Sequence, residues 1–514
     1  MSIDGLVTFV ALVVALFALA TDARRKSLML RLGVTVTLTV IFGAAVLYLE
    51  LFSVWAPDCH YSDAVCRVLV LDGDDPWITP QQAAFVLVLI WLLLVALNLR
   101  RKSLEARHVP RLSALITALA DEKRYPELSR FAEPHLDFIT EVAAGSKGAT
   151  DVQKEAAIAL QRMLYRRRDI VRFLAIERPA MTIRMLAIKK QIVFDFSDQV
   201  LTHLIADTDS PLFTEIEDNQ NVDVRGGYAF PEHNPYLHFL FGDAEQANRL
   251  GAWQPVLQHT LTTLSEAKGQ PYQTYLNGPA ERFPDLKWRD PTFVSIRYLD
   301  LMVDAAMRQG VQWHMWLFYM PLLTKSLLAL YDDPRKDQEV IDEWPTRNAY
   351  LIYSIFSAMV DWIEAVEHLP DNSPHLVLES EAAVHQNGNI PKSAIIALGD
   401  CLRQVLISPA VSDRFKDYLA EIVFRCIDKL PITGAKAGFR NSLIASLIAG
   451  GPSHATDHHT RLWQAFGDLD HMLQHRLGDV RTALEAALGI QPVRAPPPRA
   501  RGPRGGGEPP NDVA

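Results

Sequence analysis

The chain has 514 residues, a formal net charge of −9 and four cysteines. The negative charge argues against nucleic acid as a partner of the whole protein. The sequence contains no Walker A motif, G-x-G-x-x-G fingerprint, G-x-S-x-G elbow or C-x-x-C pair. The common nucleotide, serine-hydrolase and dithiol chemistries are therefore not indicated.

Three apolar segments lie within the first hundred residues, at 5–21, 32–52 and 77–99. A hydrocarbon core about 30 Å thick needs roughly 20 mainly apolar residues in a helix. None of the segments shows the polar stripe, repeated every 3.6 residues, that a surface helix of a soluble protein carries. The sequence therefore predicts a three-span transmembrane anchor over residues 1–108, with a loop at 53–76 between the second and third spans.

Charges next to the spans predict their orientation. The connections after the first and third spans are basic, whereas the loop between the second and third spans is acidic. The residues concerned are Arg24, Arg25, Lys26 and Arg31 after the first span, Arg100, Arg101, Lys102, Arg107 and Arg111 after the third, and Asp58, Asp63, Asp72, Asp74 and Asp75 in the loop. Because positive charge is retained in the cytoplasm, we expect the amino terminus outside the cell and the bulk of the chain in the cytoplasm. The anchor would lie in a plasma or inner membrane.

A cleavable signal peptide is the alternative interpretation of the first segment, because Ala18-Leu19-Ala20 resembles a cleavage site. Signal peptides begin with a basic region. Here the basic residues follow the apolar segment, which favours an uncleaved span.

Two features of the predicted anchor suggest specific contacts, a disulfide in the loop and close packing of a helix. Cys59 and Cys66 lie in the outward loop, where an oxidising compartment would favour a disulfide between them. Thr35, Thr39 and Gly43 are spaced four apart, so they share one helix face. Small residues at that spacing allow close helix packing, either among the three spans or between copies in a homo-oligomer.

The rest of the chain predicts a mainly α fold, arranged as a bundle or an irregular stack of helical hairpins. We expect a basic helical subdomain at 109–206 and a larger helical domain at 207–490. The clearest helix follows Thr346, its expected N-cap, because apolar residues recur with helical spacing from Ala349 to Val366. Further helical patterns cover residues 152–164, 244–264, 293–307, 393–406 and 415–427, whereas 207–235 and 270–291 are expected to be long irregular loops.

A basic cluster lies in the first subdomain. It includes Arg166, Arg167, Arg168 and Arg172. Anionic lipid headgroups are the nearest ligand for such a cluster in a membrane-tethered chain, and nucleic acid is a weaker alternative. A solvated face that pairs with nearby acids is the simpler interpretation.

Histidines concentrate near the carboxy-terminal end. His454 and His458 form one i, i+4 pair, and His471 and His475 form another, so each pair would share a helix face. Such imidazoles, completed by an aspartate, suit zinc or another divalent transition metal. No H-E-x-x-H motif is present, and a solvated polar segment explains the same residues.

Residues 491–514 are rich in proline, arginine and glycine, and we expect a disordered tail there. The first functional hypothesis is a membrane-anchored scaffold or sensor that binds a cytoplasmic protein partner. A membrane-tethered, metal-dependent enzyme that uses the histidines is one alternative, although no catalytic residue is indicated. An oligomeric, pore-type effector gated by the cytoplasmic domain is the other.

Overall fold

The computed structural model describes residues 11, 15, 32–55, 80–100, 105–145, 148–188, 192–222, 228–280, 286–312, 316–332, 344–378, 389–434, 436–449 and 455–490. Every regular element within these ranges is a helix, and none of the described residues forms a β-strand. The predicted mainly α fold is therefore confirmed. The chain divides into two compact units, Met1–Leu204 and Ile205–Ala514.

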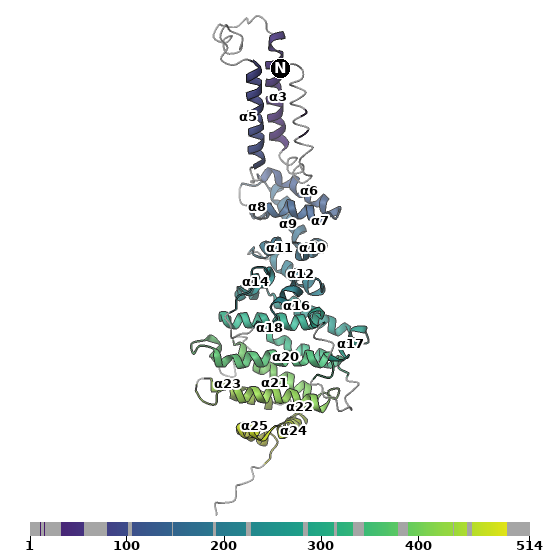
Figure 1. The fold of residues 1–514 in the computed structure, drawn as a ribbon, viewed down its shortest axis with the longest axis vertical. Helices are drawn as coiled ribbons and strands as arrows, with labels where there is room; N and C mark the ends of the chain where they lie inside the picture. The colour runs from purple at the N-terminus through teal and green to yellow at the C-terminus, as the bar shows by residue number, and fades with distance from the viewer. Residues whose placement is uncertain are drawn as a thin grey trace, which may run out of the picture. The chain divides into compact units, whose positions relative to one another are not determined.

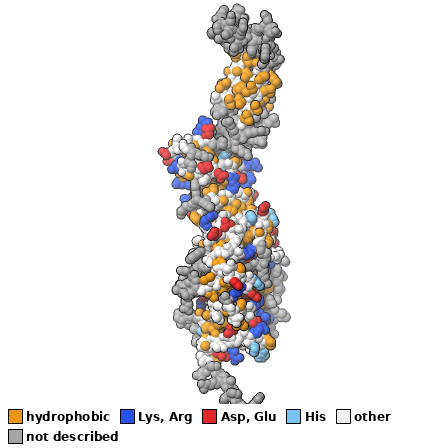
Figure 2. All heavy atoms as spheres, turned by 90° about the vertical axis from the view of Figure 1, so that its left-hand side faces the viewer, with side chains coloured by type: hydrophobic (Ala, Val, Ile, Leu, Met, Phe, Trp, Pro, Cys, Tyr) orange, Lys and Arg blue, Asp and Glu red, His pale blue; other side chains and the backbone are white. Residues whose placement is uncertain are grey.

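The first unit contains a pair of long apolar helices, α3 (Leu32–Trp55) and α5 (Pro80–Arg100), which lie side by side in Figure 1. The Trp91 indole Nε1 donates a hydrogen bond to Thr39 Oγ1 at 3.2 Å. Val46 and Ala84 are buried in the same contact region. Most other described side chains of the pair are apolar and exposed, and Figure 2 shows them as an orange band.

Three membrane spans at the amino terminus are not supported by the described residues. Among them, one helical stretch is long and apolar enough to cross a membrane, Arg347–His368, and 67% of its most apolar part is buried inside the protein. Such burial is typical of a core helix. The apolar stretches described in α3 and α5, Thr37–Leu49 and Ala83–Leu94, are shorter than a span. The predicted span at 5–21 lies outside the described residues, apart from residues 11 and 15.

The remainder of the first unit consists of short amphipathic helices packed against their neighbours. Helix α9 packs against both α6 and α8, and buries Leu160 and Leu164. Proline in the first turn begins α6, α7 and α11, where its missing N–H is no loss. The helices are η1 (Ala106–His108), α6 (Val109–Asp121), α7 (Tyr125–Ala132), η2 (Glu133–His135), α8 (Leu136–Ala143), α9 (Asp151–Arg166), α10 (Arg168–Glu177), α11 (Pro179–Leu186) and α12 (Ile192–Ala206).

The second unit is a two-layered stack of helices. In one layer α16, α18, α20, α22 and α24 pack in succession, and in the other α19, α21 and α23 do so (Figure 1). The elements are α13 (Pro211–Asp218), α14 (Pro235–Phe241), α15 (Ala244–Arg249), α16 (Trp253–Glu266), α17 (Pro271–Leu276), η5 (Lys287–Arg289), α18 (Pro291–Gln309), η6 (Trp316–Phe318), α19 (Tyr319–Leu330), α20 (Arg347–Glu364), η7 (Ala365–His368), η8 (Pro374–Leu376), α21 (Ile390–Ile407), α22 (Asp413–Lys429), α23 (Ala437–Ile448), α24 (Ala455–Gly467), α25 (His471–Arg476) and α26 (Gly478–Ala487).

Helix α20 lies at the centre of this stack, in contact with α18, α19, α21 and α22. Its predicted N-cap is confirmed, because Thr346 Oγ1 accepts a hydrogen bond from the Ala349 N–H at 3.1 Å. Apolar residues cover most of its circumference, and Phe356, Trp362 and Ile363 are fully buried. This helix is therefore part of the core of the second unit.

Three predicted boundaries differ from the structure. The pattern at 244–264 predicts one helix, but the chain forms α15 and α16, separated by Gly251 in the left-handed conformation with φ of +62°. Glycine adopts that conformation without steric cost, so the helix breaks there. The stretches expected to be irregular contain α13 and α17, and each of these begins with a proline after an extended N-cap residue.

Candidate functional site

Helix α18 carries four charged residues, Arg297, Asp300, Asp304 and Arg308, along a helix that is otherwise buried for most of its length. Their spacing of three, four and four residues places them on one face. Arg297 and Asp300 form an ion pair, and each side chain is only about one-sixth exposed, at 15% and 16%. A charged stripe inside a helical stack has to be satisfied by hydrogen bonds, because burying an unpaired charge is costly.

The first half of the stripe is well satisfied. One nitrogen of the Arg297 guanidinium donates to the backbone carbonyls of Asn219, Gln220 and Val222, at 3.0, 2.9 and 3.2 Å. Asp300 accepts a hydrogen bond from Trp362 Nε1 at 3.1 Å. These bonds join α18 to the chain after α13 and to the central helix α20, so this part of the stripe serves the fold.

Asp304 is the exception. Its side chain is 3% exposed, and its Oδ1 atom has no hydrogen-bond partner among the described residues. Burial, strengthened by the negative charge of Asp300, raises the pKa of Asp304 to about 9. The carboxyl group is therefore protonated at neutral pH, which is a common feature of functional sites and also of buried structural acids.

A second buried acid lies near the same helix. Glu215 on α13 accepts hydrogen bonds from the backbone N–H groups of Tyr236 and Leu237, at 3.2 and 2.8 Å. These N–H groups belong to the first turn of α14 and have no partner within that helix. Burial raises the pKa of Glu215 to about 7, although the two N–H groups oppose the shift. Glu215 thus caps α14 from a neighbouring helix.

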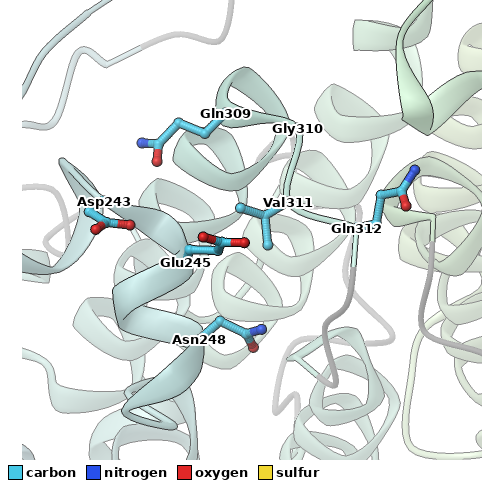
Figure 3. Close-up of a pocket in the computed structure, with 7 residues that line it drawn as sticks. All are labelled: Asp243, Glu245, Asn248, Gln309, Gly310, Val311 and Gln312. Carbon is cyan, nitrogen blue, oxygen red and sulfur yellow. The ribbon is translucent and has the colours of Figure 1, made fainter. Parts of the chain in front are cut away.

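A pocket of about 440 Å³ opens where α18 ends and α15 begins (Figure 3). Asp243, Glu245 and Asn248 line it from the α15 side, and residues Gln309–Gln312 line it from the α18 side. Gln309 holds the two walls together. Its side chain accepts from the Ala244 N–H at 2.8 Å and donates to the Phe241 carbonyl at 2.8 Å.

The pocket is electronegative. Two carboxylates line it, and the carboxy-terminal end of the 19-residue helix α18 adds the negative end of a helix dipole. No lysine or arginine is among the lining residues that the structure describes. Its chemistry suits a cationic group, such as a guanidinium or an ammonium, and it supplies no nucleophile.

The predicted histidine site is only partly described. His454 lies outside the described residues. His458 is buried, with Nε2 at 2.7 Å from the Leu447 carbonyl, and burial lowers its pKa, so it is neutral at physiological pH. His471 and His475 are exposed on α25. Within the described ranges no group of three or more His, Cys, Asp or Glu side chains could hold a metal ion. The four-histidine site stays a prediction.

The neighbouring His459, which belongs to neither predicted pair, is held in the same way as His458. Its Nε2 lies 2.8 Å from the Ile448 carbonyl. Both imidazoles therefore meet carbonyl groups at the carboxy-terminal end of α23, where the helix leaves its last carbonyls without internal partners. This contact gives the two histidines a role in the fold.

Two members of the predicted basic cluster, Arg166 and Arg167, form ion pairs with nearby acids. Arg166 pairs with Asp195 at 3.0 Å, and Arg167 pairs with Asp121 and Asp169 at 2.8 and 3.1 Å. Arg168 and Arg172 are exposed. The pKa of His203 is lowered mainly by the burial of its own side chain and further by the positive charges of Arg172 and Arg168. These ion pairs give Arg166 and Arg167 a role in the fold, and lipid contact by the cluster stays a prediction.

The anchor residues are described in part. Thr39 faces α5, as its hydrogen bond with Trp91 shows. The side chain of Thr35 is not described. A Cβ added at Gly43 would have no described atom within 4 Å. Cys59 and Cys66 lie outside the described residues. Cys401 and Cys426 are buried and free.

Sequence reasoning missed the acids that the structure brings together. The spacing of Arg297, Asp300, Asp304 and Arg308 is visible in the sequence, as a charged stripe within an apolar helix. Asp243 and Gln309 are 66 positions apart, and no pattern in the sequence relates them. Comparison with known proteins adds no assignment: no family model, no curated protein and no solved structure matches this chain.

Proposed function

We propose that this chain is a membrane-anchored α-helical protein whose cytoplasmic body binds a protein partner. The observation that carries the proposal is the apolar exterior of α3 and α5. Large hydrophobic side chains of these helices are exposed to between 40% and 63%. They are Val40, Ile41, Leu47, Tyr48, Phe85, Val86, Leu89, Ile90, Leu93 and Leu97. A continuous patch of this kind is unfavourable in water and favourable in lipid.

The lengths of the two helices support the same conclusion. Helix α3 has 24 residues and α5 has 21. At 1.5 Å per residue they are about 36 and 32 Å long, which exceeds the roughly 30 Å of a hydrocarbon core. The basic residues after α5 and the acidic loop before it support a body on the cytoplasmic side.

The body supplies binding surfaces rather than a recognisable reaction centre. The pocket between α15 and α18 offers carboxylates and amides to a cationic group, and we propose that it takes a lysine or arginine side chain of the partner. Asp243 already caps α15 through the Gln246 N–H at 3.0 Å, so Glu245 and the second Asp243 oxygen are the groups that would meet the cation.

Membrane insertion is tested by a charge at the centre of α5. Leu89 is 48% exposed, and Leu89→Arg would place a guanidinium in the hydrocarbon core at a cost of about 3 kcal/mol. We expect the variant to lose alkali-resistant membrane association. Ile432→Arg, at a position that is 71% exposed on the body, is the matched control and should fractionate like the unaltered chain. Alkali-resistant membrane association that is unchanged in Leu89→Arg, or an unaltered chain that fractionates as a soluble protein, would refute the anchor.

Partner binding is tested by purification of the full chain in mild detergent, followed by quantitative mass spectrometry of co-eluting proteins. We expect one stoichiometric partner, lost when Asp243→Asn and Glu245→Gln are combined. Glu266→Gln, which removes an acid outside the pocket, should retain it. Equal recovery of the partner from the double variant and from Glu266→Gln would contradict a role for the pocket. Failure to recover a partner even from the unaltered chain would contradict the proposed binding function.

A further inference from the structure

A short segment between α20 and α21 packs on the carboxy-terminal end of α18. We define this segment, residues 370–378, as the strap; it contains η8. Pro374 of the strap contacts the last turn of α18, because its Cγ atom would lie 3.6 Å from a Cβ added at Gly310, the C-cap of that helix. The side chain of Asn389, the N-cap of α21, donates to two strap carbonyls, at 2.6 and 2.9 Å. The strap is therefore held between the end of one core helix and the start of another.

The strap buries a histidine whose ring has no hydrogen bonds. The side chain of His375 is fully buried, and both of its ring nitrogens are shielded from solvent. Neither nitrogen has a hydrogen-bond partner among the described residues. A neutral imidazole carries one donor and one acceptor, and burying either without a partner is unfavourable. The imidazole is therefore a cost to the closed strap that an apolar side chain of similar size would avoid.

The nearest acceptor is already occupied. The Ala306 carbonyl of α18 acts on the ring of His375, although the geometry falls short of a hydrogen bond: burial lowers the pKa of His375, and this carbonyl opposes the shift. The same oxygen accepts the N–H groups of Gly310 and Val311, which close the end of α18. A carbonyl oxygen has two lone pairs, so the end of the helix leaves none for the imidazole.

No charged side chain of the described residues compensates a proton on this ring. Burial and the Ala306 carbonyl are the two influences on the pKa of His375. The charged residues of the contacting elements are not among them. These residues are Asp304 and Arg308 on α18, Lys392 on α21, Asp371 on the strap, and Lys436, which donates to the Glu367 and Leu369 carbonyls just before the strap.

A proton on His375 would therefore be unfavourable while the strap is closed. Protonation gives the ring a second N–H and a positive charge. A buried charge without a partner is strongly unfavourable. When the strap opens, the imidazole reaches water and regains an ordinary pKa of about 6.5. Acid therefore favours the open strap over the closed one.

We propose that His375 is a proton-sensitive latch: its neutral form keeps the strap on the end of α18, and its protonation in mild acid releases the strap. Residues Gln309–Gln312, which follow the turn that Pro374 contacts or belong to it, also line the acidic pocket (Figure 3). The closed strap thus supports one wall of the pocket, and acid withdraws that support. The latch itself depends neither on what the pocket binds nor on the membrane anchor.

The test is backbone hydrogen–deuterium exchange of the full chain in detergent at pH 7.5 and pH 5.5, with labelling times scaled to the intrinsic exchange rate at each pH. The pKa of His375 is lower in the closed strap than in the open one, so the closed strap is favoured above about pH 6.5 and loses this preference as the pH falls. If the closed strap binds no proton, the ratio of open to closed strap rises about tenfold between the two pH values. We expect peptides that cover the strap to exchange about tenfold faster at pH 5.5, and peptides from the interior of α20 to show no such rise. Equal scaled exchange of the strap at both pH values would overturn the proposal.

Two variants assign the response to the imidazole. His375→Leu removes the unpartnered nitrogens, so we expect slower exchange of the strap at both pH values and no rise in acid. His375→Gln stays polar but cannot be protonated, and it should also lose the rise even if the strap becomes looser. His368→Gln changes an exposed histidine just before the strap, is the matched control, and should keep the tenfold rise. A rise that persists in both His375 variants would assign the response to another group and refute the latch.

A second measurement requires no substitution. The C2 hydrogen of a histidine ring exchanges with solvent through the protonated imidazole, and mass spectrometry follows this exchange residue by residue. At pH 7.5 we expect the His375 ring to exchange at least about tenfold more slowly than the exposed ring of His368, because the closed strap excludes both water and the proton. Equal rates for the two rings would show that His375 is open to solvent at neutral pH, which would refute the latch.

Discussion

The proton on Asp304 is a property of the folded state. The usual pKa of an aspartate is 3.8, and burial in α18 raises it to about 9. The folded chain therefore binds one proton more than the unfolded chain between these values. The contribution of the Asp304 carboxyl group to the stability of the folded state is complete below about pH 4 and is lost as the pH rises towards 9. Glu215 and Asp290, whose pKa values burial raises to about 7 and about 6, act in the same direction.

Asp304→Asn replaces the protonated carboxyl group by a neutral group of similar shape. We expect the stability of the variant relative to the unaltered protein to be greater at pH 8 than at pH 5 by up to about 4 kcal/mol, because both pH values lie between 3.8 and about 9 and each pH unit contributes about 1.4 kcal/mol. Thermal unfolding of the purified chain at both pH values measures the difference. Asp371→Asn, with a fully exposed side chain, is the control and should show the original pH dependence. An unchanged slope in Asp304→Asn would contradict the assignment.

At the scale of elements, close helix packing depends on a glycine in α21. A Cβ at Gly399 would meet Ser446 Oγ and would lie 2.9 Å from the Ser446 carbonyl oxygen. Ser446 Oγ itself donates to the Ile395 carbonyl at 3.0 Å. The backbones of α21 and α23 thus approach each other at this point, and the hydroxyl group is not free to rotate away.

Gly399→Ala should therefore destabilise the protein, even though alanine favours a helix by about 1 kcal/mol. We expect a net loss of roughly 1–2 kcal/mol, because the two helices must move apart. Gly467→Ala is the matched control: no atom lies within 4 Å of its would-be Cβ, so the same substitution should be neutral or slightly stabilising. Chemical denaturation of both variants gives the comparison. Equal effects would show that α21 and α23 are free to separate.

Helices and their caps were more predictable than the contacts between them. Periodicity and Thr346 located α20 because both are local properties. The break at Gly251 was missed, since a glycine within an apolar pattern is compatible with a continuous helix until its φ is known. The acidic pocket joins residues from separate helices, and its assembly depends on how the stack packs. His458, predicted as a ligand, instead contacts the Leu447 carbonyl, a partner that side-chain spacing does not reveal.

At the scale of the whole molecule, two cysteines report on the integrity of the second unit. Cys401 lies on α21, where Thr324 Oγ1 donates to its sulfur at 3.3 Å, and Cys426 lies on α22. Both are fully buried, and burial raises the pKa of Cys401 to about 12 and that of Cys426 further. Because the thiolate is the reactive form, both side chains should be inert in the folded protein.

We expect a Cys59→Ser, Cys66→Ser variant of the full chain to react with a maleimide at pH 8 at least about 1,000-fold more slowly than in denaturant, since labelling requires opening of the stack. Mass spectrometry of the labelled protein over time measures both rates. Fast labelling of Cys426 alone would indicate that α22 separates from its neighbours independently. Fast labelling of both would contradict the described core.

The burial of α20 has a consequence for synthesis of the chain. Helices α18 and α19 precede it in the sequence, but α21 and α22, which also cover it, follow it, so α20 leaves the ribosome before these two partners exist. For that interval a helix long and apolar enough to cross a bilayer lacks these two partners. Three charged residues of α20 raise the cost of inserting it into lipid: Arg347 at its start, and Asp361 and Glu364 near its end. A charge at the centre of a span costs about 3 kcal/mol, and a charge nearer an end costs less. These three charges, together with chaperones that bind nascent apolar segments, favour packing of α20 in the core of the second unit over insertion into lipid.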